Sequence, residues 1–183
     1  MNLNKLVGSL VAAVAIGATA QLSISLGEDT AIAPVTGQSL AVSLAAFLLG
    51  RNWGVVAILI YLLLGGLGLP VFADFEGGIN VIMGPSMGYF IGFVLAAAFM
   101  GWWAETKENK FGKNFIAFTL GTLLILVSGL VGLLAYLDLK AAFMKGILPF
   151  LPGALIKILL ATILISVISR FQALMNRDDL RQK

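Results

Sequence analysis

The chain has 183 residues, of which 60% are hydrophobic and 11% charged, with a net charge of +3 and a mean hydropathy of +1.01. The apolar share lies well above the roughly 45–50% of soluble domains, which excludes an ordinary soluble protein. Cysteine and histidine are absent, which excludes disulfides, thiol nucleophiles, imidazole bases and the commonest transition-metal ligands, and we expect no cofactor.

Six apolar segments follow one another along the chain and predict membrane helices. They cover about 3–22, 34–49, 53–67, 87–104, 115–137 and 147–171. An apolar membrane core of about 30 Å needs about 20 helical residues per crossing, and such runs favour helices over the short alternating strands of a barrel. The sequence therefore predicts one all-α integral membrane domain over residues 1–183, with a bundle of six transmembrane helices.

The basic residues gather at segment ends and therefore indicate membrane orientation rather than nucleic-acid binding. If six segments alternate, nine basic residues fall on one side: Lys5, Arg51, Lys107, Lys110, Lys113, Arg170, Arg177, Arg181 and Lys183. Three fall on the other: Lys140, Lys145 and Lys157. Because Lys and Arg are enriched in cytoplasmic loops, both termini are predicted in the cytoplasm. The connections 23–33, 68–89 and 138–146 then share the outer face.

The first segment carries a stripe of small residues. Ser9, Ala13 and Gly17 recur at intervals of four, a spacing that lets another helix approach closely in lipid. The stripe predicts either packing inside this bundle or docking onto a separate membrane protein. Lys5, the apolar run and residues 18–20 also resemble a cleavable signal peptide, a less favoured interpretation because cleavage would leave five spans.

A stretch rich in Gly and Pro, GLPVFADFEGGINVIMGPSMGY, begins at Gly68. The Gly-Gly pair that ends at Gly78 permits backbone geometries closed to other residues, so Asn80 and nearby backbone groups can turn toward a ligand. Irregular backbone at membrane depth persists only where it is buried in protein or lines a cavity. Asp74 and Glu76 are either solvated or part of such a site.

Residues 84–88 match the pattern G-x-S-x-G, which marks a nucleophile elbow in α/β hydrolases. Without histidine, Ser86 could be activated only by a lysine such as Lys157, and a membrane serine hydrolase that uses this pair is an alternative function. We prefer the interpretation that Pro85 and Ser86 begin a helix and that Gly88 permits close packing.

Lys157 lies inside an apolar segment near its outer end, where a cation costs roughly 2.5–3.5 kcal/mol unless it finds a partner or snorkels to the interface. A binding site is favoured because the polar residues Thr36, Gln38 and Ser39 belong at the same end. No G-x-x-x-x-G-K-[ST] motif for ATP occurs, so any uphill transport needs energy from another protein. The pattern predicts a binding subunit with an outward-facing polar pocket.

Several motifs in order carry a family resemblance. They are Pro34–Val42, Leu49–Gly50, Tyr61–Gly65, Gly68–Ala73, the Gly and aromatic positions of 84–93, and Leu148–Gly153 with Lys157. This set resembles the biotin-specific substrate-binding subunits of energy-coupling factor (ECF) transporters, the BioY family. The motifs are dense over residues 34–93, and the fifth segment matches in hydrophobicity only.

The resemblance implies a multi-pass protein of the bacterial cell membrane that captures biotin on the outer face and is not itself an enzyme. It implies as partners a transmembrane coupling protein and a pair of cytoplasmic ATPases, which explains the missing ATP site. It also favours docking onto the coupling protein as the role of Ser9, Ala13 and Gly17.

The same resemblance implies the binding residues. The candidates are Asn80, Lys157, Gln38, Gly78, Tyr89 and Phe72, with Phe75 as a further apolar contact. Asn80 and Lys157 are expected at the ureido ring of biotin, although Lys157 could instead meet the carboxylate.

One position departs from the family pattern. Members usually carry Asp directly after the Pro-Gly of the last segment, where this chain has Ala154. Loss of a charged hydrogen bond costs roughly 1.5–3 kcal/mol, and Lys157 loses a counter-charge one helical turn away. Either Asp74 or Glu76 substitutes, or the ligand is a relative of biotin.

Overall fold

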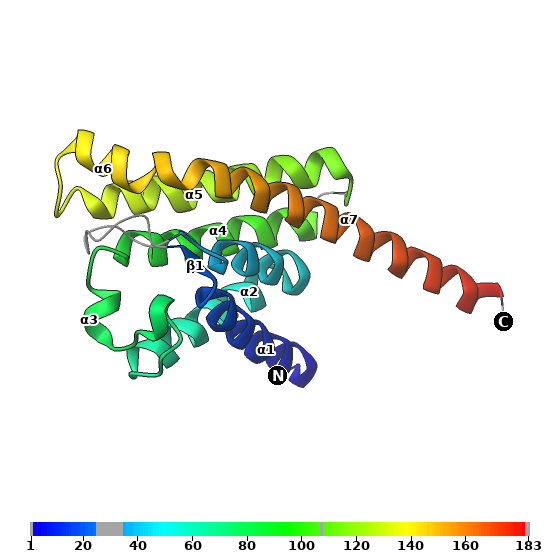
Figure 1. The fold of residues 1–183 in the computed structure, drawn as a ribbon. Coiled ribbons are helices and arrows are strands. Elements are labelled where there is room, and N and C mark those ends of the chain that lie inside the picture. The colour runs from blue at the N-terminus through cyan, green and yellow to red at the C-terminus, as the bar shows by residue number, and fades with distance from the viewer. Residues whose placement is uncertain (1, 25–34, 107, 182–183) are drawn as a thin grey trace.

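The computed structural model describes residues 2–24, 35–106 and 108–181, and these residues are nearly all helical (Figure 1). Most of the predicted outer connection 23–33, and Lys107, lie outside the described residues. The elements are α1 (Leu3–Ala20), β1 (Ser23–Ile24), β2 (Val35–Thr36), α2 (Gln38–Gly66), η1 (Ala73–Phe75), α3 (Ile79–Ile82), α4 (Met87–Thr106), α5 (Phe111–Leu133), α6 (Leu139–Gly146), η2 (Leu148–Phe150) and α7 (Leu151–Arg181). The two short strands pair antiparallel, with Ser23 opposite Thr36.

Helix α2 consists of two arms that fold back on each other at Gly50. The backbone of Gly50 has a φ of 81°, outside the helical region. A Cβ atom at Gly54 would lie 2.7 Å from the Cα of Ala46, whereas residues eight apart in a straight helix are separated by about 12 Å. The arms 38–49 and 51–66 are therefore the predicted second and third segments.

The described residues contain five helical stretches long and apolar enough to cross a membrane when α2 is taken as one. With its two arms counted separately, the predicted order of six apolar segments is confirmed. The predicted fold class, an all-α membrane bundle, is likewise confirmed.

The bundle has two distinct ends. At one end α1 begins, α2 turns at Gly50 and α4 connects to α5, and we call this the termini end. We call the opposite end the loop end. Arg51 N–H donates to Glu105 Oε1 over 2.9 Å at the termini end. At the loop end, Tyr136 Oη donates to the carbonyl of Met83 over 3.0 Å. Figure 1 shows α3 and the α5–α6 connection at the loop end, away from both termini, as the predicted alternation requires.

Helices α4 and α5 approach closely because glycines face each other. A Cβ atom at Gly132 would lie 2.7 Å from the Cα of Gly88, and one at Gly92 would lie 2.8 Å from the Cα of Ile125. Small residues allow such backbone contact in lipid, where packing rather than the hydrophobic effect drives helix association. The predicted packing role of Gly88 is confirmed.

The connection 138–146, predicted as a turn, contains helix α6 instead. Asp138 caps this helix, its Oδ1 accepting a hydrogen bond from Ala141 N–H over 2.9 Å. A capping carboxylate satisfies a free N–H of the first turn and complements the positive end of the helix dipole. Lys145, in the last turn, complements the negative end of the dipole. These local signals explain why a helix forms here although it is too short to be recognised as an apolar segment in the sequence.

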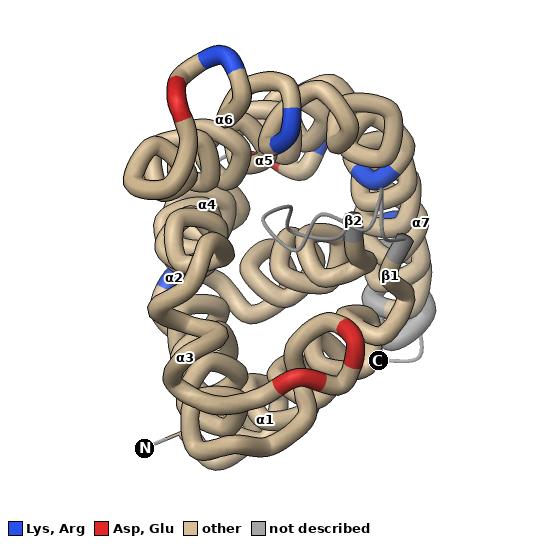
Figure 2. Tube along the Cα trace, turned by 60° about the vertical axis from the view of Figure 1, so that its left-hand side comes forward, with Lys and Arg blue, Asp and Glu red and all other residues tan. Residues whose placement is uncertain are grey.

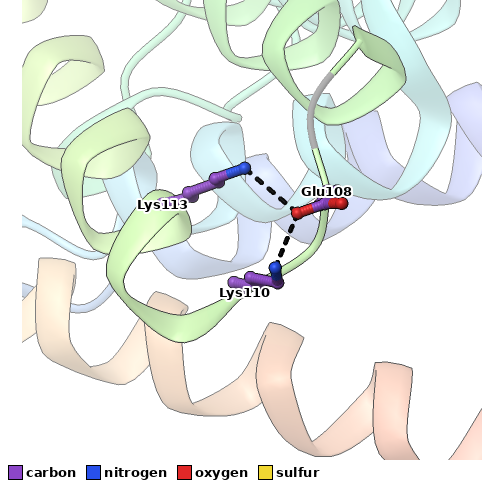
Figure 3. A network of polar contacts seen from close by, with 3 residues as sticks. All are labelled: Glu108, Lys110 and Lys113. Atoms are coloured by element: carbon purple, nitrogen blue, oxygen red, sulfur yellow. Dashed lines mark hydrogen bonds and ion pairs between the residues drawn. The ribbon is translucent and has the colours of Figure 1, made fainter.

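The α4–α5 connection carries a small ion-pair network (Figure 3). Glu108 Oε2 lies 2.7 Å from Lys110 Nζ and 3.2 Å from Lys113 Nζ. Hydrogen bonds from the two lysines lower the pKa of the Glu108 carboxyl, and the bond from Lys110 has the larger effect. These side chains are exposed, so the network is expected to contribute little to stability.

Candidate functional site

Lys157, near the start of α7, contacts the beginning of α2. Its Nζ donates to the carbonyl of Thr36 over 2.9 Å and to Ser39 Oγ over 2.8 Å, and the side chain is half-buried. The predicted convergence of Lys157 with the polar start of the second segment is confirmed. Both protein partners are neutral, and the ammonium group has three N–H donors. One donor and the full positive charge thus remain without a matching group among the described residues.

Gln38 extends this contact into the core. Its Nε2 donates to Tyr61 Oη over 2.6 Å, and its Oε1 accepts from Thr36 Oγ1 over 2.9 Å. Gln38 is buried and Tyr61 is 0% exposed. A continuous polar chain therefore runs from Tyr61 through Gln38 and Thr36 to Lys157. We call these four residues and Ser39 the Lys157 network.

Tyr61 is not among the site residues that the sequence predicts. A tyrosine inside an apolar run is ordinary in a membrane helix, but a buried hydroxyl usually needs a hydrogen-bond partner. The hydrogen bond between Tyr61 and the predicted Gln38, 23 positions away, appears only in the structure, so no sequence signal marks Tyr61 as a site residue.

Phe72 is 1% exposed and forms the apolar wall beside this network. Its ring meets that of Tyr61 edge to face, with centroids 5.5 Å apart, and that of Phe90 at 5.0 Å. Phe75, the second predicted apolar contact, is 70% exposed. Of these two residues, only Phe72 is therefore buried beside the Lys157 network in this conformation.

The loop between α2 and α3 is irregular, as its sequence predicts. Gly78 has a φ of 104°, and its N–H donates to the carbonyl of Gly65 over 2.7 Å. Asn80 follows in the first turn of α3 and is exposed. Its amide has no hydrogen bond among the residues that the structure describes, so both its donor and its acceptor are available.

Tyr89, a predicted pocket residue, contacts the connection between α6 and α7. Its Oη donates to the carbonyl of Gly146 over 2.7 Å, and its ring stacks on Phe150 with centroids 5.6 Å apart. The structure thus shows Tyr89 tying α4 to the α6–α7 connection. Its predicted place in a ligand pocket stays a prediction.

The predicted carboxylates do not reach Lys157 in this structure. Asp74 Oδ1 accepts from Ser23 Oγ over 2.7 Å, and both Asp74 and Glu76 are exposed. Ala154 is 8% exposed on the same helix as Lys157. Within the described ranges no ion pair to Lys157 occurs, so neither acid replaces the missing counter-charge by direct contact. Figure 2, which turns the loop end forward, shows charged positions mainly in the connections at its rim.

The stripe of small residues on α1 is buried against the chain itself. Ser9 is 0% exposed and donates to the carbonyl of Trp53 over 2.9 Å, and Ala13 is 2% exposed. A Cβ atom at Gly17 would lie 3.2 Å from the Cβ of Val71. These contacts correspond to packing inside the bundle. Docking of the stripe onto another protein stays a prediction and would require α1 to move.

The hydrolase alternative requires a hydrogen bond between Ser86 and Lys157. In the part of the chain that the structure describes, Lys157 Nζ donates to Thr36 and Ser39, and no hydrogen bond joins it to Ser86. The backbone carbonyl of Ser86 accepts from Phe90 N–H at the start of α4, consistent with the preferred helix-start interpretation.

These features define the chain as a multi-pass membrane protein with a half-buried polar site at one end of its bundle. A sequence model of the BioY family matches residues 1–173. The chain therefore belongs to the BioY family, whose members are transporter components and not enzymes.

Individual relatives agree with this assignment. The chain is 38% identical over 158 residues to the biotin transporter BioY of Thermotoga maritima, covering 86% of this chain and 89% of that protein. It is 38% identical over 159 residues to the probable biotin transporter BioY of Pyrococcus horikoshii, covering 87% and 91%. The crystal structure of the S-component for biotin from an ECF-type ABC transporter superposes with a TM-score of 0.81 at 25% identity, covering 93% and 94%.

Proposed function

We propose that this chain is the biotin-binding S component of an ECF-type transporter and that it binds the vitamin at the loop end. The observation that carries the proposal is the Lys157 network, a charged and incompletely paired group at that end of a BioY-family bundle. The biotin transporters among the relatives, and the structural match to an S component for biotin, support the same ligand.

The chemistry of the loop end fits the two polar parts of biotin. The ureido ring needs both donors and acceptors, which the free amide of Asn80 offers, while Phe72 provides an apolar wall for the thiophane ring and Gly78 brings backbone close. Lys157 can donate its remaining N–H to the ureido oxygen or to the carboxylate. Without an acid at Ala154, the uncompensated positive charge favours the carboxylate.

Comparison of biotin with biotinamide distinguishes these two arrangements. If Lys157 meets the carboxylate, the amide binds more weakly to the wild type, and Lys157→Ala removes most of that difference. If Lys157 meets the ureido ring, the variant weakens both ligands by the same factor.

The partners and location follow from the same proposal. The chain has no nucleotide-binding motif, so a transmembrane coupling protein and two cytoplasmic ATPases would supply the energy for import. The location that goes with this function is the bacterial plasma membrane. The nine-to-three distribution of basic residues supports an orientation with both termini in the cytoplasm and the loop end outside.

Calorimetric titration of the purified protein in detergent with biotin and lipoate tests the ligand. The method is chosen because the three tryptophans (Trp53, Trp102 and Trp103) lie at the termini end, far along the bundle from the site. Micromolar or tighter biotin binding with weak lipoate binding supports the proposal. Preference for lipoate supports the alternative that Ala154 adapts the pocket to another biotin-like ligand, and heat from neither contradicts both.

A further inference from the structure

The side chain of Gln21, just beyond the end of α1, holds the loop between α2 and α3. Its Nε2 donates to the carbonyl of Phe72 over 2.8 Å, and its Oε1 accepts from Phe75 N–H over 3.0 Å. Nε2 also lies 3.2 Å from the carbonyl of Gly17 in the last turns of α1. One amide thus bonds both edges of the turn 72–75 and anchors it to α1.

The turn held by Gln21 has an unfavourable backbone shape. Asp74 and Phe75 are consecutive residues with φ values of 56° and 58°, in the left-handed region that side chains with a Cβ disfavour. Two backbone hydrogen bonds within the loop oppose this preference, from Phe72 N–H to the carbonyl of Glu76 over 3.0 Å and from Glu76 N–H to the carbonyl of Ala73 over 3.1 Å. Gln21 and Ser23, whose Oγ donates to Asp74 Oδ1 over 2.7 Å, add contacts from outside the loop. Without the Gln21 contacts, the turn is expected to open more often.

The same turn is in contact with the Lys157 network. Phe72, whose carbonyl Gln21 binds, packs its ring edge to face on Tyr61, and Tyr61 Oη accepts from Gln38. Further along the loop lie Gly78 and Asn80. Displacement of the turn would therefore move the apolar wall of the site and the residues that follow it.

We propose that Gln21 is a positioning residue for ligand binding: it does not contact the ligand, and it holds the turn 72–75 in the conformation that completes the pocket. This inference rests on the proposed function for the ligand and on the hydrogen bonds above for the mechanism. The hydrogen bonds of Gln21 also connect α1 to the site, so a movement of α1 would displace Phe72.

The variant Gln21→Ala removes all three hydrogen bonds of the amide. We expect biotin to bind roughly tenfold more weakly, because the pocket must be re-formed for each binding event and only a fraction of the protein is then competent to bind. In the ligand-free protein, backbone amide hydrogen exchange in 70–80 should become faster while exchange in α4 and α5 is unchanged. Thr19→Val is the matched control, because among the described residues the Thr19 hydroxyl bonds only to carbonyls of α1 itself, those of Ala15 and Ile16.

Gln21→Glu is a second variant that separates the donor of the amide from its acceptor. It keeps an acceptor for Phe75 N–H but turns a carboxylate oxygen toward the carbonyls of Phe72 and Gly17, so a loss of affinity at least as large as that of Gln21→Ala is expected. If wild type binds biotin and Gln21→Ala changes neither the affinity nor the exchange of 70–80, the inference is wrong. A loss of protection throughout the bundle would also contradict it, because Gln21 would then be a general structural residue.

Failure of the proposed function gives a different result. If wild type binds no biotin while Gln21→Ala still accelerates exchange in 70–80 and Thr19→Val does not, the hold of Gln21 on the turn is supported and the ligand assignment is what fails.

Discussion

Both ends of the bundle use glycine at close backbone contacts and side-chain hydrogen bonds between distant residues, and they differ in whether a polar group is left incompletely paired. At the termini end the chain turns on glycine: Gly50 has a φ of 81°, and a Cβ atom at Gly101 would lie 2.6 Å from the Cα of Arg51. At the loop end the connections are held by side-chain hydrogen bonds over long sequence distances, such as Gln21 to Phe72 and Lys157 to Thr36. The contacts of Lys157 at the loop end leave one N–H donor and its positive charge available for a ligand.

The largest expected effect comes from breaking the termini end. Gly101→Val would force α4 away from the turn of α2, and overpacking of this kind costs about 1–3 kcal/mol, with more where backbone blocks relaxation. We expect a clear fall in the melting temperature in detergent, with biotin affinity nearly unchanged in the fraction that stays folded. Equal stability of variant and wild type would show that the close approach of these helices is not required.

Breaking the loop end should instead affect binding. Tyr61→Phe removes the acceptor of Gln38 Nε2 and leaves a buried donor unpaired, at a cost of about 1–3 kcal/mol. Both stability and biotin affinity should fall. Ser9→Ala is the matched change at the termini end, where a buried hydroxyl that donates to Trp53 is lost. If it weakens binding as much as Tyr61→Phe, the two ends are not functionally distinct.

The smallest effect is expected at the exposed Glu108 network. Because hydrogen bonds from Lys110 and Lys113 lower the pKa of the Glu108 carboxyl, its contribution is present above the ordinary glutamate pKa of about 4.3. That contribution is lost as the pH falls through the lowered value. Melting temperatures of wild type and Glu108→Gln should nearly coincide at pH 7 and converge fully in acid. A large difference at pH 7 would show that this surface network matters to the fold.

Much of the fold is predictable from sequence because its signals are local or follow from alternation. Apolar runs mark the helices, and Gly88 marks a close contact of α4 with α5. The convergence of Lys157 with the start of α2 follows once six segments alternate, since both must then lie at the same end. Helix α6 was missed because capping by Asp138, rather than hydrophobic length, defines it.

The detailed site is less predictable because it depends on pairings that no local pattern contains. Gln21 and Phe72 are 51 positions apart, and nothing in either neighbourhood indicates the contact. A tyrosine such as Tyr61 or Tyr89 can equally line a pocket or tie helices together, and only the position of its hydroxyl partner distinguishes the roles. Tyr61 bonds within the Lys157 network, whereas Tyr89 bonds to Gly146.

The central claim is that the charge of Lys157 binds biotin at the loop end, and the most direct test is calorimetric biotin titration of Lys157→Ala beside Lys140→Ala. Lys140 is an exposed lysine at the same end, on α6, so it controls for net charge. We expect Lys157→Ala to raise the Kd roughly ten- to a hundredfold, the equivalent of about 1.5–3 kcal/mol, and Lys140→Ala to leave it unchanged. Similar Kd values for Lys157→Ala and wild type, with both proteins folded, would contradict the account.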